Sequence, residues 1–255
     1  MWDTDNLAGQ VMLVVLLFYG VMLVLAPVAL RLTFKHQSKV FPRTVSFEEL
    51  PAAVRDFMQP KVDAILLWGF DLVAYLNVGE LVPGSQAFVA LLSNPHTNEW
   101  ADVSYVVSWR KSRGYMGFVT RCSGDLQVDT NTNATLPVLF PLPNYRVFAF
   151  PQVDDVFTLY RVHRMLVQQN VNGDRPVLPP RGQEIAELQR RLERFGPSQQ
   201  ARGYMYLDSA GKVYRLTWKG SIVGGWRSIW PMPWLRRWRK RLESEAILRK
   251  VDAAQ

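Results

Sequence analysis

Four side chains in this sequence could take part in catalysis if the fold brought them together: His163, Cys122, His96 and Glu99. A thiol beside an imidazole is a common covalent catalyst, and Cys122 with His163 would supply that pair. Each also has a structural explanation. His163 lies on an apolar helical stripe, Cys122 lies on a predicted strand, and the other two lie in the hairpin-like loop 94–100. We therefore expect a non-enzymatic protein, and an enzyme whose cleft unites these residues is the less favoured alternative.

Metal and cofactor chemistry find little support in the sequence. The three histidines, His36, His96 and His163, have no second histidine or cysteine three or four positions away, so a zinc site is not expected. The D-x-N-x-N sequence that starts at Asp129 lacks the glycine and the final acid of a calcium loop. Phosphate-binding and nucleophile-elbow motifs are absent. A single cysteine excludes a disulfide within the chain, and no cofactor is predicted.

The element that would position everything else is the uncharged stretch from Leu7 to Leu30. As a helix it would extend roughly 36 Å, enough to cross a hydrocarbon core of about 30 Å. Its acidic N-terminal flank and its length argue against a cleaved signal peptide. Arg31, Lys35 and Lys39 follow at once, and basic residues beside a membrane helix favour the cytoplasmic side. We predict a single-pass protein of the cell membrane with its N-terminus outside and residue 31 onward in the cytoplasm.

The net charge of +8 is concentrated at the two ends of the polar part of the chain. Residues 31–40 carry +3 and residues 226–255 carry +5, whereas residues 41–219 hold 19 basic and 17 acidic side chains. A nearly neutral body lacks the basic face of a nucleic-acid groove, so no nucleic acid is expected as a partner. The pattern divides the chain into an anchor and juxtamembrane segment (1–40), a cytoplasmic domain (41–219) and a basic tail (220–255).

Periodicity predicts an α+β body, with a mostly antiparallel β-meander and helices packed on one face. Helices are expected over about 51–68, 155–169 and 183–195, and Pro60 should kink or divide the first. Asp154 is the predicted N-cap of the second helix and Gly196 the predicted stop of the third. The expected strands are 71–78, 86–92, 103–109, 116–122, 126–129 and 145–150, with a hairpin over 204–207 and 213–218.

The tail has the composition of an interfacial membrane helix. Tryptophan recurs every four residues, at Trp226, Trp230, Trp234 and Trp238. Prolines at 231 and 233 exclude one continuous helix, so we expect a new helix to begin at Pro233. Its apolar arc holds Trp234, Leu235, Trp238 and Leu242, and the rest of the wheel holds Arg236, Arg237, Arg239, Lys240 and Arg241. Such a helix suits an anionic membrane surface. Three alternatives stay open: tryptophans that anchor the core of the body, a solvated tail, and an RNA-binding tail.

These features favour interaction over catalysis. We expect an accessory, assembly or scaffold subunit at the cytoplasmic face of the membrane, whose partners are inner-leaflet anionic lipid and other membrane-protein subunits. The alternative is a membrane-tethered module that binds a lipid or small ligand, which an apolar cavity larger than about 300 Å³ would favour.

Overall fold

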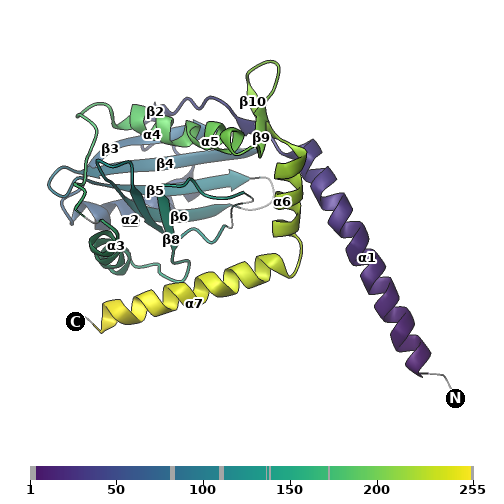
Figure 1. Ribbon diagram of the computed structural model, residues 1–255. Helices are drawn as coiled ribbons and strands as arrows, with labels where there is room; N and C mark the ends of the chain where they lie inside the picture. The colour runs from purple at the N-terminus through teal and green to yellow at the C-terminus, as the bar shows by residue number, and fades with distance from the viewer. Residues whose placement is uncertain are drawn as a thin grey trace.

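The computed structural model describes residues 4–80, 84–108, 112–135, 137, 139–171 and 173–253. It is an α+β fold with an N-terminal apolar helix, a mostly antiparallel sheet and helices packed around it, which confirms the predicted fold class (Figure 1). Asp3, in the acidic N-terminal flank, and Trp109, predicted to end a strand, lie outside the described residues.

The helices of the described chain follow one another in this order: α1 Thr4–Thr33, α2 Ala52–Leu66, α3 Val156–Asn170, α4 Glu184–Glu193, α5 Phe195–Ala201, α6 Trp218–Ser228 and α7 Met232–Asp252. The strands are β1 His36–Gln37, β2 Arg43–Val45, β3 Asp71–Gly79, β4 Ser85–Asn94, β5 Glu99–Ser108, β6 Arg113–Arg121, β7 Gln127–Asn131, β8 Tyr145–Ala149, β9 Met205–Leu207 and β10 Val213–Leu216.

The main sheet has seven strands in the order β2-β3-β4-β5-β6-β7-β8. Its pairs are antiparallel except β7 with β8, which is parallel. As the last strand in this order, β8 forms one edge of the sheet. The parallel pair is possible because the long stretch between β7 and β8 returns the chain to the same end of the sheet. A second sheet joins β1, β10 and β9 and contains the predicted hairpin.

The two faces of the main sheet are covered differently. The larger core lies under α2 and α3, where Met58 and Leu159 pack with Phe118 of β6. A smaller cluster on the opposite face joins Leu188 of α4 to Trp100. The predicted cover of one face by helices thus accounts for α2 and α3, whereas α4 lies on the other face because its stripe is also apolar.

Three local predictions need correction. Helix α2 continues through Pro60 and is not divided there, because burial of Val54, Met58, Val62 and Ile65 holds the turns on both sides; the alternative, a kink at Pro60, stays a prediction. The N-cap of α3 is Asp155, whose carboxylate accepts a hydrogen bond from the Thr158 N–H at 2.7 Å. Gly196 does not stop a helix but lies inside α5, where a Cβ would come within 2.3 Å of the Tyr214 ring.

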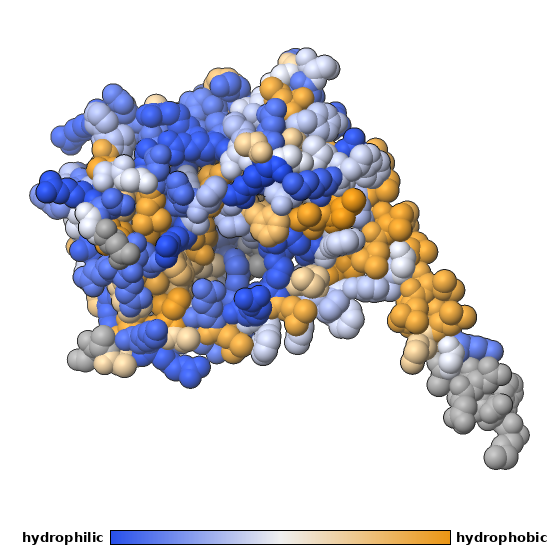
Figure 2. All heavy atoms as spheres, in the orientation of Figure 1, coloured by the Kyte–Doolittle hydropathy of each residue, from blue (hydrophilic) through white to orange (hydrophobic). Residues whose placement is uncertain are grey.

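Helix α6 packs antiparallel against the second half of α1 (Figure 1). Gly225 allows this approach, since a Cβ there would lie 2.8 Å from Pro27. The Arg31 guanidinium donates to the Leu216 carbonyl at 2.7 Å and lies 4.7 Å from the centre of the Trp218 ring. The rest of α1 projects from the body as an apolar surface (Figure 2). The span Gly9–Thr33 is long and apolar enough to cross a membrane.

Helix α7 crosses beneath the sheet and ends near α3 (Figure 1). The chain breaks between α6 and α7 at the prolines, as predicted, although the new helix begins at Met232. Its C-terminal end is fixed by burial of Val251 in the larger core. Its exposed side carries Trp234 and Trp238, whose rings stack with centroids 6.2 Å apart.

Candidate binding site

Glu99 and His163 come together in the structure, but inside the core beneath α3. The fully buried Glu99 carboxylate accepts hydrogen bonds from Arg164 at 2.6 Å and from the Tyr160 hydroxyl at 2.9 Å. His163 is also fully buried, and its two ring nitrogens lie 2.9 and 3.0 Å from the hydroxyls of Thr120 and Thr130. Strand register places Glu99 opposite Thr120. Every ring nitrogen and carboxylate oxygen of the pair is therefore already occupied by a protein partner.

Cys122 and His96 lie apart from that network. Cys122 is only 1% exposed at the end of β6, and burial, with a smaller contribution from Asp174, raises the pKa of its thiol. A raised pKa disfavours the thiolate that a nucleophile needs. His96 lies in the turn between β4 and β5, where its backbone N–H donates to the Asn94 side chain at 3.0 Å. Neither of the cavities described below is lined by His163, Cys122, His96 or Glu99.

Because His163 is buried, we expect the free energy of unfolding to depend on pH. Desolvation, with repulsion from Arg164, lowers its pKa from 6.5 to about 3, so the unfolded chain binds the proton first as pH falls. The stability contributed by the neutral ring is complete above pH 6.5 and is lost towards pH 3, by up to about 1.4 kcal/mol per pH unit. Urea unfolding of the full chain in detergent should show this loss for the wild type relative to His163→Gln. Parallel pH curves for the two proteins would contradict the assignment.

A cavity of about 810 Å³ lies between β8, Pro137 with residues 140–142, α6 and α7. Figure 2 shows this face of the molecule hollowed between α7 and the sheet. We call it the cationic cavity because six basic side chains and one carboxylate, that of Glu243, line it. The basic residues are Arg146, Arg191, Arg227, Arg236, Arg239 and Lys240. Three of these, Arg236, Arg239 and Lys240, are among the tail cations assigned from the sequence to the membrane interface.

Most of these charges lack an acidic partner. Within the described part of the chain, Arg227, Arg236, Arg239 and Lys240 form no ion pair. Arg227 stacks over the Phe140 ring at 4.3 Å, and Arg236 donates to the Pro137 carbonyl at 2.9 Å. Burial lowers the pKa of Arg227, Arg236 and Lys240, and repulsion from neighbouring arginines adds to the effect in the last two. The arrangement favours an anion that would offset this repulsion.

Three residues of the lining also carry a buried polar atom without a partner among the described residues. The Nε2 of His36, the hydroxyl of Tyr145 and the Nε of Arg227 are buried and make no hydrogen bond among the described residues. The remaining wall is largely apolar, with Phe140, Leu142, Val147, Phe148, Leu192 and Phe195. The cavity therefore combines hydrogen-bond donors, positive charge and an apolar wall.

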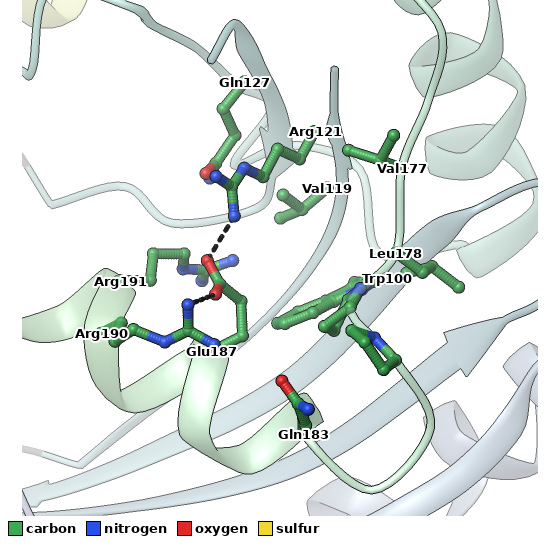
Figure 3. A pocket seen from close by; sticks show the side chains of 12 residues that line it. Trp100, Val119, Arg121, Gln127, Val177, Leu178, Gln183, Glu187, Arg190 and Arg191 are labelled. Carbon is green, nitrogen blue, oxygen red and sulfur yellow. Dashed lines mark hydrogen bonds and ion pairs between the residues drawn. The ribbon is translucent and has the colours of Figure 1, made fainter. Parts of the chain in front are cut away.

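A second cavity, of about 250 Å³, lies under α4, and its charges are internally paired (Figure 3). The Glu187 carboxylate forms ion pairs with Arg121 at 2.6 Å and with Arg190 at 2.9 Å. Arg191 separates this cavity from the cationic cavity and faces Asp102 at 3.7 Å. Because its carboxylate and arginines neutralise one another, the smaller cavity is the weaker candidate for a charged ligand.

Comparison of the chain with models of protein families, with curated proteins and with solved structures gave no match. The functional conclusion therefore rests on the geometry. The cationic cavity could not be predicted from local sequence patterns, because its walls come from segments far apart in the chain. One signal was present: the tail carries more basic side chains than its acids can pair, and Arg236 and Lys240 share one face of the helix at i,i+4 spacing.

Proposed function

We propose that this protein is a single-pass, membrane-anchored interaction module, held against an anionic membrane surface by α1 and by the α6–α7 arm (residues 218–252). In this proposal it acts as a non-enzymatic accessory or scaffold subunit. Its body presents a fixed orientation to other membrane proteins, because two attachments restrict the rotation that a single tether would allow.

The observation that carries the proposal is the exposure of the arm's indoles. Trp230 is 73% exposed, and four other tryptophans of the arm are at least half exposed: Trp218, Trp226, Trp234 and Trp238. Exposed apolar area of this kind marks an interaction surface in a soluble context, and tryptophan prefers the headgroup level of a membrane. The exposure also argues against the alternative in which these tryptophans anchor the core of the body.

One hydrogen bond fixes the position along α1 at which α7 begins. The Tyr19 hydroxyl donates to the Trp230 carbonyl at 2.6 Å, and Tyr19 precedes Arg31 by about 18 Å of helix. With the start of α7 at the headgroups, about 20 Å of the apolar part of α1, from Leu7 to Tyr19, lies below that level. Since a hydrocarbon core is about 30 Å thick, this length is too short, and we infer that the bilayer thins around the arm. The basic residues nearest the membrane are then those of α7, which strengthens the inward orientation of the body.

Topology is tested with the full chain expressed in cells. We expect protease added to intact cells to leave the body uncut and to degrade it after the membrane is opened. In a eukaryotic host, Asn133 of the Asn133-Ala134-Thr135 sequon should carry no glycan, because a cytoplasmic sequon is not modified. Digestion of the body in intact cells, or a glycan on Asn133, would show that the body lies outside the cytoplasm and would contradict the proposed orientation.

A further inference from the structure

We propose that the cationic cavity binds a phosphate-bearing anionic amphiphile, a phospholipid of the membrane to which the body is attached, with the phosphate among the α6–α7 cations and the chain along the apolar wall. This inference deepens the ligand-binding alternative and rests on the proposed membrane attachment for the source of the lipid.

The positions of the cations fit a phosphate. Arg227 comes from α6 and Arg236 from the first turns of α7, and the Arg236 guanidinium donates to the Arg227 backbone carbonyl at 3.4 Å. Both side chains line the cavity. Guanidinium groups bind phosphate oxygens in a bidentate manner and do so without changing their own charge. Arg239 and Lys240, one turn further along α7, would extend the positive surface to a second oxygen. Within the described chain no carboxylate lies within 4 Å of these four side chains, although Glu243 of the lining attracts Lys240 from a greater distance.

The apolar wall and the size of the cavity favour an amphiphile over a free ion. A single phosphate would leave most of about 810 Å³ unfilled, whereas this volume is typical of pockets for larger ligands, which range over about 300–1,000 Å³. Phe140, Leu142, Phe148 and Phe195 offer the surface that an acyl chain would cover. Because α6 packs on α1, the wall that carries Arg227 lies beside the membrane helix itself.

An acidic peptide added to the edge strand is the competing occupant. Strand β8 is paired on one side only and borders the cavity. Peptides that add to a sheet edge gain most of their affinity from backbone hydrogen bonds. With only five residues, Tyr145–Ala149, β8 offers few such bonds, so the structure favours the amphiphile and the peptide becomes an outcome of the test.

The test uses the full chain in non-ionic detergent micelles and native mass spectrometry to count bound lipid. The probes are dimyristoyl phosphatidylglycerol and dimyristoyl phosphatidylcholine. We expect the wild type to retain the anionic lipid at least about tenfold more strongly, and Arg227→Gln/Arg236→Gln to lose about tenfold or more of that affinity. The matched control, Arg249→Gln/Lys250→Gln, removes two exposed charges of α7 that do not line the cavity and should bind like the wild type. Equal retention by the two double variants, with unchanged thermal unfolding, would overturn the proposal.

Two further arms separate the sources of the anion. Inorganic phosphate in excess should not displace the lipid, and displacement by phosphate alone would show a free-ion site instead. If the lipid bound without headgroup preference and poly-glutamate displaced it, the cavity would be a peptide site. That result would also overturn the proposal. Trp234→Ala/Trp238→Ala should bind lipid in micelles like the wild type, since these rings are exposed outside the cavity. Failure of membrane attachment by the arm is therefore distinguishable from failure of lipid binding.

Discussion

Replacing Arg164 by methionine should lower the free energy of unfolding by about 3–5 kcal/mol, the cost of leaving a buried charge without its partner. Glu99 is completely buried, and its carboxylate depends on Arg164 at 2.6 Å and on the Tyr160 hydroxyl at 2.9 Å. The Arg164 side chain is itself 42% exposed, so most of the loss comes from the carboxylate that stays behind. Urea unfolding of the full chain in detergent, followed by circular dichroism, measures the change.

The matched control removes both charges at once. Glu99→Gln/Arg164→Met leaves a neutral amide that can still accept from Tyr160, so it should recover more than half of the stability lost in the single variant. A loss below about 1 kcal/mol in Arg164→Met, or no recovery in the double variant, would mean that the pair does not hold α3 to β5 as the structure indicates.

Removing two indoles from the arm should detach α7 from the membrane while leaving the body folded. Each half-exposed ring is expected to contribute about 2 kcal/mol at the membrane surface, so Trp234→Ala/Trp238→Ala should lower the equilibrium constant for attachment of α7 roughly a thousandfold. The two rings stack on each other, are at least half exposed and belong to none of the buried core clusters. An environment-sensitive dye on Leu242→Cys, in full chains reconstituted into anionic vesicles, should shift to the red in the variant.

Tyrosine provides the matched control for the indoles. Trp234→Tyr/Trp238→Tyr keeps an aromatic ring with a polar tip, which membranes also accept at the headgroup level, so this variant should retain most of the wild-type signal. If the alanine and tyrosine variants gave the same emission as the wild type, the indoles would not hold the arm at the membrane.

Local patterns of the sequence predicted much of the secondary structure. The period-2 runs located the strands of the sheet, and the prolines at 231 and 233 located the break before α7, because both signals depend on neighbouring residues alone. Glycine is less informative. Gly196 has the same sequence signature whether it stops a helix or admits a neighbouring ring, and only the position of Tyr214 decides between them.

The site was less accessible to sequence reasoning. The tail was recognised as basic and rich in tryptophan, but its division into two sides needs the body. Trp234 and Trp238 face away from the sheet, whereas Arg236 and Lys240 face β8 across the cationic cavity. The same holds for His163 and Glu99. Their types suggested chemistry, and the structure places both in a fully hydrogen-bonded core instead.

The most direct measurement of membrane attachment is the depth of α7 in a bilayer. The full chain carries one other cysteine, Cys122, which is 1% exposed and therefore protected from labelling. A dye on Leu242→Cys should be quenched by phospholipids brominated near the headgroup in anionic vesicles, and a dye on Ser209→Cys, in the β9–β10 turn at the far end of the body, should not. Equal and weak quenching at both positions would contradict the proposal that the arm lies on the membrane.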